Sequence, residues 1–169
     1  MPPNGCHKGP GYKSPQDAMR AAREALLYTV CNYNQSGIRA PDYLATIGAD
    51  PLKADEYGSV IHRLEMPNMD DELHHFGWNA CSSCHCDAKQ QRKFLLLCGL
   101  QSGNVHIVDT GTDPRAPTLH KTLSAAEIKE KTGMHGPHEV HCLRSDIMIS
   151  MMGDSPESAG LMILDQDFE

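Results

Sequence analysis

Two short segments of the chain gather side chains that commonly bind metal ions or react as thiols. The first segment, Asp70–Cys86, contains three histidines, three cysteines and the only tryptophan of the protein. The second segment, Met134–Cys142, contains three histidines and one cysteine. Neutral imidazole suits copper and zinc, and thiolate suits soft metal ions. The two segments therefore predict metal or thiol chemistry.

The first segment offers five clear ligand groups, which belong to His74, His75, Cys81, Cys84 and Cys86. A structural zinc site usually needs two separated cysteine pairs, or one cysteine pair and a histidine pair at set spacing, and only one C-x-x-C pair is present. A thioredoxin-like redox pair needs the strand-to-helix turn of a βαβ unit, which the sequence lacks. Soft-metal ligands, reactive thiols and loop cysteines without a partner all remain open for the three cysteines.

The second segment places His138 and His141 three positions apart. The preceding Gly136-Pro137 argues against the helix on which zinc proteases carry their histidines. We expect His138 and His141 in a loop that turns into a strand, either as metal ligands or as hydrogen-bonded structural residues. Two histidine pairs in one chain favour ligation, and an imidazole-dominated site with an open position suits catalytic copper or zinc.

The other histidines and cysteines are predicted to be structural. His62 and His106 fall within strand-like runs and His120 lies close to one, so solvent exposure or cross-strand packing is expected. Cys98 and Cys142 close strands and are expected to be small buried side chains. Seven cysteines are an odd number and too sparse for a disulfide scaffold, which predicts mostly reduced thiols.

Length and charge restrict the class of protein. The chain has 169 residues, 40% of them hydrophobic, which suits about one domain. Fifteen basic and 22 acidic residues give a net charge of −7, which excludes a basic surface for nucleic acid. No run reaches the roughly 18 to 20 apolar residues of a membrane-spanning helix, and residues 1–10 lack the apolar core of a signal peptide. We expect a cytosolic protein.

The elements that must position these side chains are mainly short strands. Apolar runs of strand length alternate with turns rich in Gly, Pro, Asn and Asp. The runs are Leu26–Val30, Tyr43–Ile47, Ser59–Leu64, Phe94–Leu97, Val105–Val108, Ile147–Met151 and Leu161–Leu164. Their spacing predicts an antiparallel all-β fold and leaves a sandwich, a barrel or a propeller open.

Two segments predict short helices inserted between the strands. Ser14 is suited to cap a helix that begins at Pro15. Ser124 and Glu127 form a capping box at the start of a second helix that runs to Lys131. Residues 1–13, rich in Pro and Gly, are expected to form an extended arm.

A recurring strand end favours the propeller among the all-β folds. The segments Asn104–Asp109 and Leu161–Asp165 are both apolar strands that close on Asp and run into a loop, as propeller blades often do. The chain stops at Glu169, just past a strand, and such an end would leave an unpaired apolar edge. We therefore expect a fragment.

Several ordered motifs are spread along the whole chain. They are Gly9–Tyr12, Ala40–Thr46, Val60–Leu64, Met66–Asn68, Asp71–His75, Gly77–Asn79, Cys81–Cys84, Val108–Asp109, Asp113–Pro117 and His141–Cys142. Together these motifs closely resemble the selenium-binding protein family, also called methanethiol oxidases. The resemblance implies that residues 14–169 are the N-terminal, incomplete part of a β-propeller, with roughly three to four blades.

The resemblance also implies an activity, which is oxidation of methanethiol with dioxygen and water to formaldehyde, hydrogen sulfide and hydrogen peroxide. The implied cofactor is copper held by histidines. Carried over to this sequence, the ligands are His74, His75 and either His138 or His141. A further family histidine lies in the C-terminal part, so this chain alone is expected to hold an incomplete site and to be inactive.

An alternative implied by the same resemblance is non-catalytic binding of selenium or electrophiles through Cys81, Cys84 or Cys86, with a role in transport within the Golgi. The family also implies nuclear and peripheral membrane locations besides the cytosol. Vertebrate members carry a selenium-linked cysteine where this chain has Gly58, followed by Ser59. Selenium attachment at that position is therefore excluded here.

Overall fold

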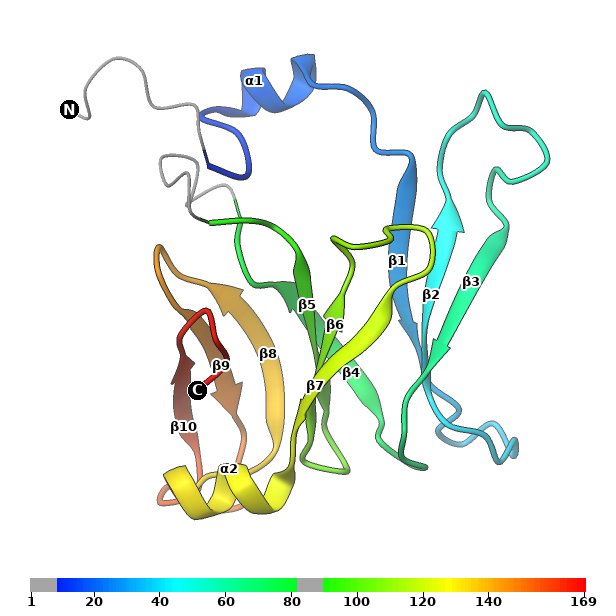
Figure 1. The fold of residues 1–169 in the computed structure, drawn as a ribbon. Helices are drawn as coiled ribbons and strands as arrows, with labels where there is room; N and C mark the ends of the chain where they lie inside the picture. Colours follow the sequence, from blue (N-terminus) through cyan, green and yellow to red (C-terminus); the bar gives the residue numbers. More distant parts are fainter. Residues whose placement is uncertain (1–8, 82–89) are drawn as a thin grey trace.

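A computed structural model describes residues 9–81 and 90–169, and in these residues the chain forms three antiparallel sheets (Figure 1). The first sheet has the order β1-β2-β3. Its strands are β1 (Leu26–Cys31), β2 (Tyr43–Gly48) and β3 (Val60–Glu65). Each strand pairs with the next one in the sequence, which makes the sheet a simple meander.

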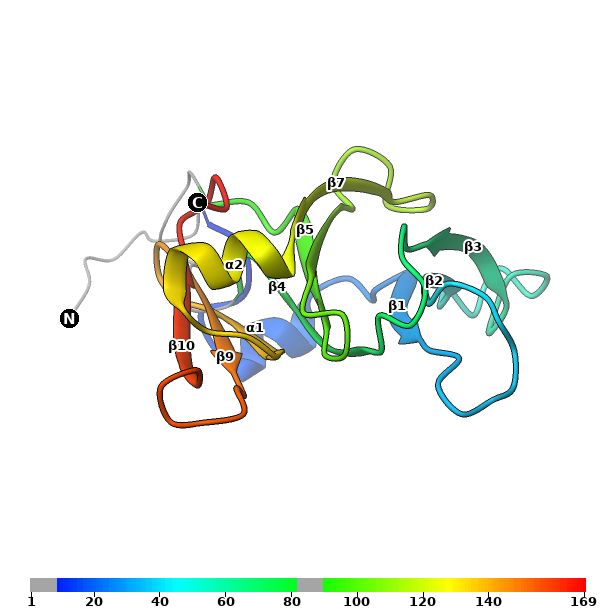
Figure 2. The same cartoon turned by 90° about the horizontal axis from the view of Figure 1, so that it is seen from below.

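The second and third sheets repeat this meander. The second has four strands, namely β4 (Leu73–Trp78), β5 (Phe94–Gly99), β6 (Val105–Asp109) and β7 (Thr118–Leu123). The third has three strands, namely β8 (Pro137–Cys142), β9 (Ile147–Met151) and β10 (Gly160–Leu164). Figure 2 shows the three sheets side by side, like successive blades of a propeller that do not close into a ring. The predicted all-β fold with propeller blades is confirmed.

The middle sheet is buried on both faces because a sheet packs against each side of it. Along β5, alternate side chains point to opposite faces. Leu96 and Cys98 join a core cluster with residues of the third sheet, such as Ile149. Leu95 and Leu97 join a second cluster with residues of the first sheet. The continuous apolar run of β5 is therefore the sequence of a strand between two blades.

The described residues contain two short helices, as predicted, one before the first strand and one between β7 and β8. Helix α1 (Pro15–Arg20) is capped by Ser14, whose side chain accepts a hydrogen bond from the backbone of Asp17. Helix α2 (Ala125–Thr132) is capped by Ser124 in the same way and crosses from β7 to β8 (Figure 1). In the described residues, no helix has the length and apolar character needed to cross a membrane.

The two strand-ending aspartates have the same local role. The Asp109 carboxylate accepts hydrogen bonds from the backbone of Gly111 and Thr112 and lies 3.2 Å from Lys93 Nζ. Asp165 accepts hydrogen bonds from the backbone of Asp167 and Glu169. Each aspartate thus closes the turn after its strand, which explains why the pattern recurs in successive blades.

Candidate metal centre

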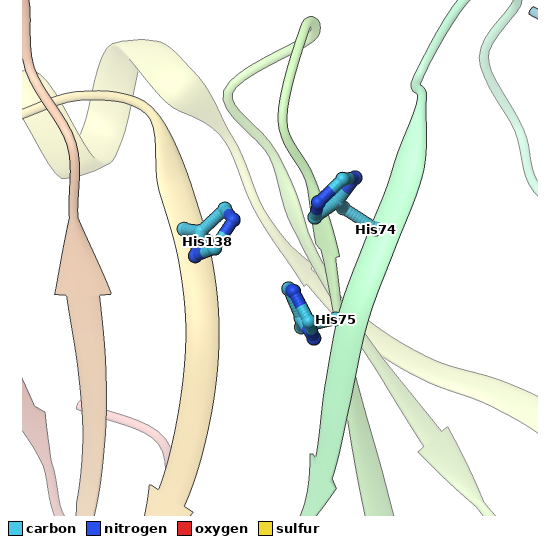
Figure 3. A group of neighbouring side chains, drawn as sticks. All are labelled: His74, His75 and His138. Carbon is cyan, nitrogen blue, oxygen red and sulfur yellow. The ribbon is translucent and has the colours of Figure 1, made fainter.

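The candidate site lies between β4 and β8, which are edge strands of the second and third sheets. The two strands lie side by side and run in the same direction (Figures 1 and 3). Their close approach depends on Gly77, because a Cβ atom there would lie 2.6 Å from the carbonyl oxygen of Val140. Close backbone packing at Gly77, and not a shared hydrogen-bond ladder, sets the distance between these two strands.

A β-bulge in β4 turns two consecutive histidines toward this gap. Leu73 pairs with Gly99, whereas Phe76 pairs with Leu97, so β4 has one more residue than β5 between these two pairs. A regular strand would point His74 and His75 to opposite faces, but an extra residue breaks the alternation. Figure 3 shows both imidazoles on the side of β4 that faces β8.

A matching bulge lies in β8. Pro137 pairs with Met151 and Val140 pairs with Ile149, so β8 also has one more residue than its partner strand. The bulge contains His138, whose imidazole points toward His74 and His75 (Figure 3). The prediction that His138 and His141 lie in a loop is wrong, because both are part of β8.

The three imidazoles form a compact group. Ring centroids are 4.7 Å apart for His74 and His75, 4.9 Å for His74 and His138, and 4.6 Å for His75 and His138. One nitrogen from each ring lies within 4.8 Å of the other two. His74 and His75 are exposed and His138 is half-buried, so solvent and small molecules can reach the group.

His138 is held in the form that binds metals. Burial lowers the pKa of His138, and the neighbouring His75 and His74 lower it further, while Glu139 acts in the opposite direction. A lower pKa favours the neutral imidazole, whose free nitrogen lone pair is available to a metal ion.

His141 lies outside this group, although its spacing from His138 suggested an alternative ligand. Its side chain is 61% exposed, and its Nε2 atom lies 3.3 Å from the Glu139 carboxylate. The structure therefore brings together His74, His75 and His138 and leaves His141 at the surface.

Two of the cysteines form a disulfide bond. Cys81, just after β4, is bonded to Cys142 at the end of β8. The prediction of reduced thiols is wrong for this pair, and Cys142 is not an unlinked packing residue. In the bonded form Cys81 offers no reactive thiol for selenium. Cys98 is free and buried, as predicted, while Cys84 and Cys86 lie outside the described residues.

Comparison with known proteins identifies the family to which this chain belongs. The sequence profile of the 56 kDa selenium-binding proteins matches residues 6–169. The chain belongs to this selenium-binding protein family. It is 50% identical over 167 residues to selenium-binding protein 2 of Arabidopsis thaliana, covering 96% of this chain and 34% of that protein.

Other family members have oxidase names or solved structures. The chain is 51% identical over 160 residues to a methanethiol oxidase of Xenopus laevis, covering 93% of this chain and 34% of that protein. An X-ray structure of a hypothetical selenium-binding protein from Sulfolobus tokodaii superposes with a TM-score of 0.87 at 39% identity, covering 94% of this chain and 36% of that one. The chain thus spans about a third of the length of these relatives.

The donor set suits a borderline metal ion. All three ligand groups are imidazoles, and within the described residues no carboxylate belongs to the group. Copper and zinc accept such a set, whereas magnesium and calcium require oxygen ligands. Nitrogen atoms bind these ions at about 2 Å, so metal binding would draw the exposed His74 and His75 rings slightly inward. Three imidazoles also leave a coordination position for a substrate.

A buried polar network that the sequence motifs did not predict fixes the start of β4. The Asp71 carboxylate lies 2.9 Å from His106 Nε2, and both side chains are fully buried. The other nitrogen of His106 lies 3.0 Å from the Thr122 hydroxyl. Asp42 accepts a hydrogen bond from the Leu73 backbone. A histidine inside the apolar run Val105–Val108 was the available signal, but its carboxylate partner is 35 residues away in the sequence.

Proposed function

We propose that this chain provides three histidine ligands of the copper site of a methanethiol oxidase. In the proposed reaction, methanethiol, dioxygen and water give formaldehyde, hydrogen sulfide and hydrogen peroxide. The observation that carries the proposal is the convergence of His74, His75 and His138 from two bulged strands. The methanethiol oxidase relatives support the choice of reaction.

The residues of the chain have separate tasks in this proposal. A bound copper ion would supply a soft Lewis acid for a thiolate and a redox centre for electron transfer to dioxygen. The lowered pKa of His138 favours its neutral form, and this side chain would hold the ion from the half-buried side. His74 and His75 would hold it from the exposed side, where a small thiol has access.

The chain covers 34% of the methanethiol oxidase to which it is compared, so the proposal assigns it a part of the site and not the whole activity. Three histidines and an open position suit a catalytic metal centre, which is completed by substrate or by a further ligand. We therefore propose copper binding as the property of this chain, and turnover as a property of the full-length relatives.

Copper titration of the chain and of two single variants tests this proposal. Loss of one of three imidazole ligands in His138→Ala should weaken copper(II) binding at least tenfold and remove one nitrogen from the electron paramagnetic resonance spectrum. His141→Ala is the matched control, because His141 is exposed on the same strand and should leave affinity and spectrum unchanged. Equal effects of the two substitutions, or no copper binding by the unsubstituted chain, would contradict the proposal.

A further inference from the structure

The three histidines belong to two strands that share no hydrogen-bond ladder. His74 and His75 lie on β4 and His138 lies on β8, and these strands are edges of separate sheets. The position of His138 relative to the other two therefore depends on what fixes β8 against β4. If all three ligands lay on one strand, their relative positions would not depend on the contact between two strands.

Two features fix the strands, and they follow one another along the gap. Gly77 allows the β4 backbone to approach the carbonyl oxygen of Val140, two residues beyond His138. Two residues further along β8, Cys142 is bonded to Cys81, with 6.2 Å between the Cα atoms. Along both strands, the order is therefore the same: the histidines come first, the backbone contact follows, and the disulfide comes last.

The disulfide is the covalent part of this arrangement. Cys142 follows His138 by four residues, or about 13 Å of extended strand. The bond joins positions 61 residues apart in the sequence, so it links two blades and not two neighbours in one turn. A β-strand is stiff over a few residues when its own sheet holds it, and β8 is paired with β9 on both sides of the bulge that contains His138, at Pro137 and from Val140 to Cys142. A displacement of Cys142 from β4 therefore moves His138 as well.

We infer that the Cys81–Cys142 disulfide is a positioning element for the three-histidine centre. The inference rests on the proposed copper site and extends it. With the bond intact, His138 is held against His74 and His75. With the bond reduced, the covalent link between β8 and β4 is lost and the third ligand is held less firmly. Copper binding by this chain then depends on the oxidation state of one cysteine pair.

Reduction and reoxidation of the Cys81–Cys142 disulfide are both two-electron steps. A dithiol transfers two electrons and two protons to the disulfide, so the sulfur–sulfur bond breaks, two thiols form, and the dithiol becomes a cyclic disulfide. Hydrogen peroxide, a product of the proposed reaction, reverses the change. Two thiols lose two electrons and two protons to form the disulfide, and the peroxide is reduced to two molecules of water.

The test compares copper(II) affinity and electron paramagnetic resonance spectra of the oxidised chain and the double variant Cys81→Ser/Cys142→Ser. We expect about tenfold weaker binding in the double variant, as for other residues that orient metal ligands, and one fewer nitrogen in its spectrum. Cys31→Ser is the control, because Cys31 is a free cysteine on β1 in the first sheet. It should leave both measurements unchanged.

A double-mutant cycle separates positioning from general destabilisation. If the disulfide acts through His138, adding His138→Ala to the double variant should cost less copper affinity than the same substitution costs in the disulfide-bonded chain. Additive losses would overturn the inference. The variant Cys81→Ala/Cys142→Ala, with circular dichroism to verify folding, provides a second form of the unlinked protein and should give the same affinity.

The outcomes distinguish this inference from the proposed function. Three-nitrogen copper binding of equal affinity in oxidised and unlinked protein would overturn the inference and leave the proposed function in place. No copper binding by the oxidised chain would overturn both. Reduction of the unsubstituted chain by a dithiol, followed by desalting, should weaken binding to the level of the double variant, and hydrogen peroxide should restore it.

Discussion

Asp71 and His106 form a fully buried hydrogen-bonded pair just before β4 in the fold, and single substitutions can test its effect on stability. Burial raises the pKa of Asp71, but the hydrogen bonds with His106, Ser102 and Asn104 and the electrostatic attraction of His106 together outweigh it, so the pKa lies below its usual value. A carboxyl whose pKa is lowered by folding stabilises the folded state above its unfolded pKa of about 3.9. That stabilisation is lost as the pH falls through the folded pKa.

Asp71→Asn should therefore lower the free energy of unfolding at pH 7 by about 2 kcal/mol, the usual contribution of a hydrogen bond to a charged group. The difference between the unsubstituted chain and the variant should shrink below pH 4, where Asp71 of the unsubstituted chain becomes protonated. Urea unfolding at pH 7 and below pH 4 measures both effects. Asp55→Asn, at an exposed position, is the control, and a difference that stays constant with pH would refute the assignment.

Single residues also show where the sequence is informative about the site. The types and clustering of His74, His75 and His138 were sufficient to predict an imidazole site. The choice between His138 and His141 was not predictable, because it depends on a bulge that shifts the alternation of β8 by one residue. The pairing of Cys81 with Cys142 was equally hidden, since it follows from the contact between two blades.

At the scale of the element, the bulged strands β4 and β8 carry the site, and Gly77 sets their separation. Gly77→Ala should push β8 away from β4, because its Cβ would meet the Val140 carbonyl. Overpacking of this kind costs about 1 to 3 kcal/mol of stability. We also expect copper affinity to fall, since His138 lies two residues from the contact.

Gly111→Ala is the matched control for Gly77→Ala. A Cβ at Gly111 would meet only the flexible side chain of Lys93, far along the second sheet from the histidines. Thermal unfolding and copper titration of both variants make the comparison. A Gly77→Ala protein with unchanged copper affinity would show that the backbone contact does not position His138.

The same strands explain which elements the sequence predicted. Apolar strands such as β5, β6 and β9 were identified because their side chains fill the space between blades. The strands β4, β7 and β8 were missed because they carry His, Lys or Thr in place of an apolar run. The strands that carry the candidate ligands, β4 and β8, have polar sequences. The elements that form a functional site are therefore the hardest to predict from the hydrophobic pattern.

At the scale of the whole molecule, two core clusters join the three sheets, but only one of them includes residues of the third sheet, such as Val140 on β8. Leu96 belongs to the cluster between the second and third sheets, which carry the histidines. Its neighbour Leu97 belongs to the cluster between the first and second sheets. Both side chains are fully buried, so their truncations remove similar apolar contacts.

Leu96→Ala and Leu97→Ala should therefore each lower the free energy of unfolding by about 2 to 5 kcal/mol, as large-to-small core substitutions do. Copper affinity should fall only in Leu96→Ala, because a cavity between the second and third sheets lets β8 move relative to β4. A cavity on the other face of β5, as in Leu97→Ala, leaves the position of β8 relative to β4 unchanged. Urea unfolding and copper titration of the two variants provide the comparison. Equal loss of copper affinity in both would mean that the centre depends on global stability and not on the packing of two particular blades.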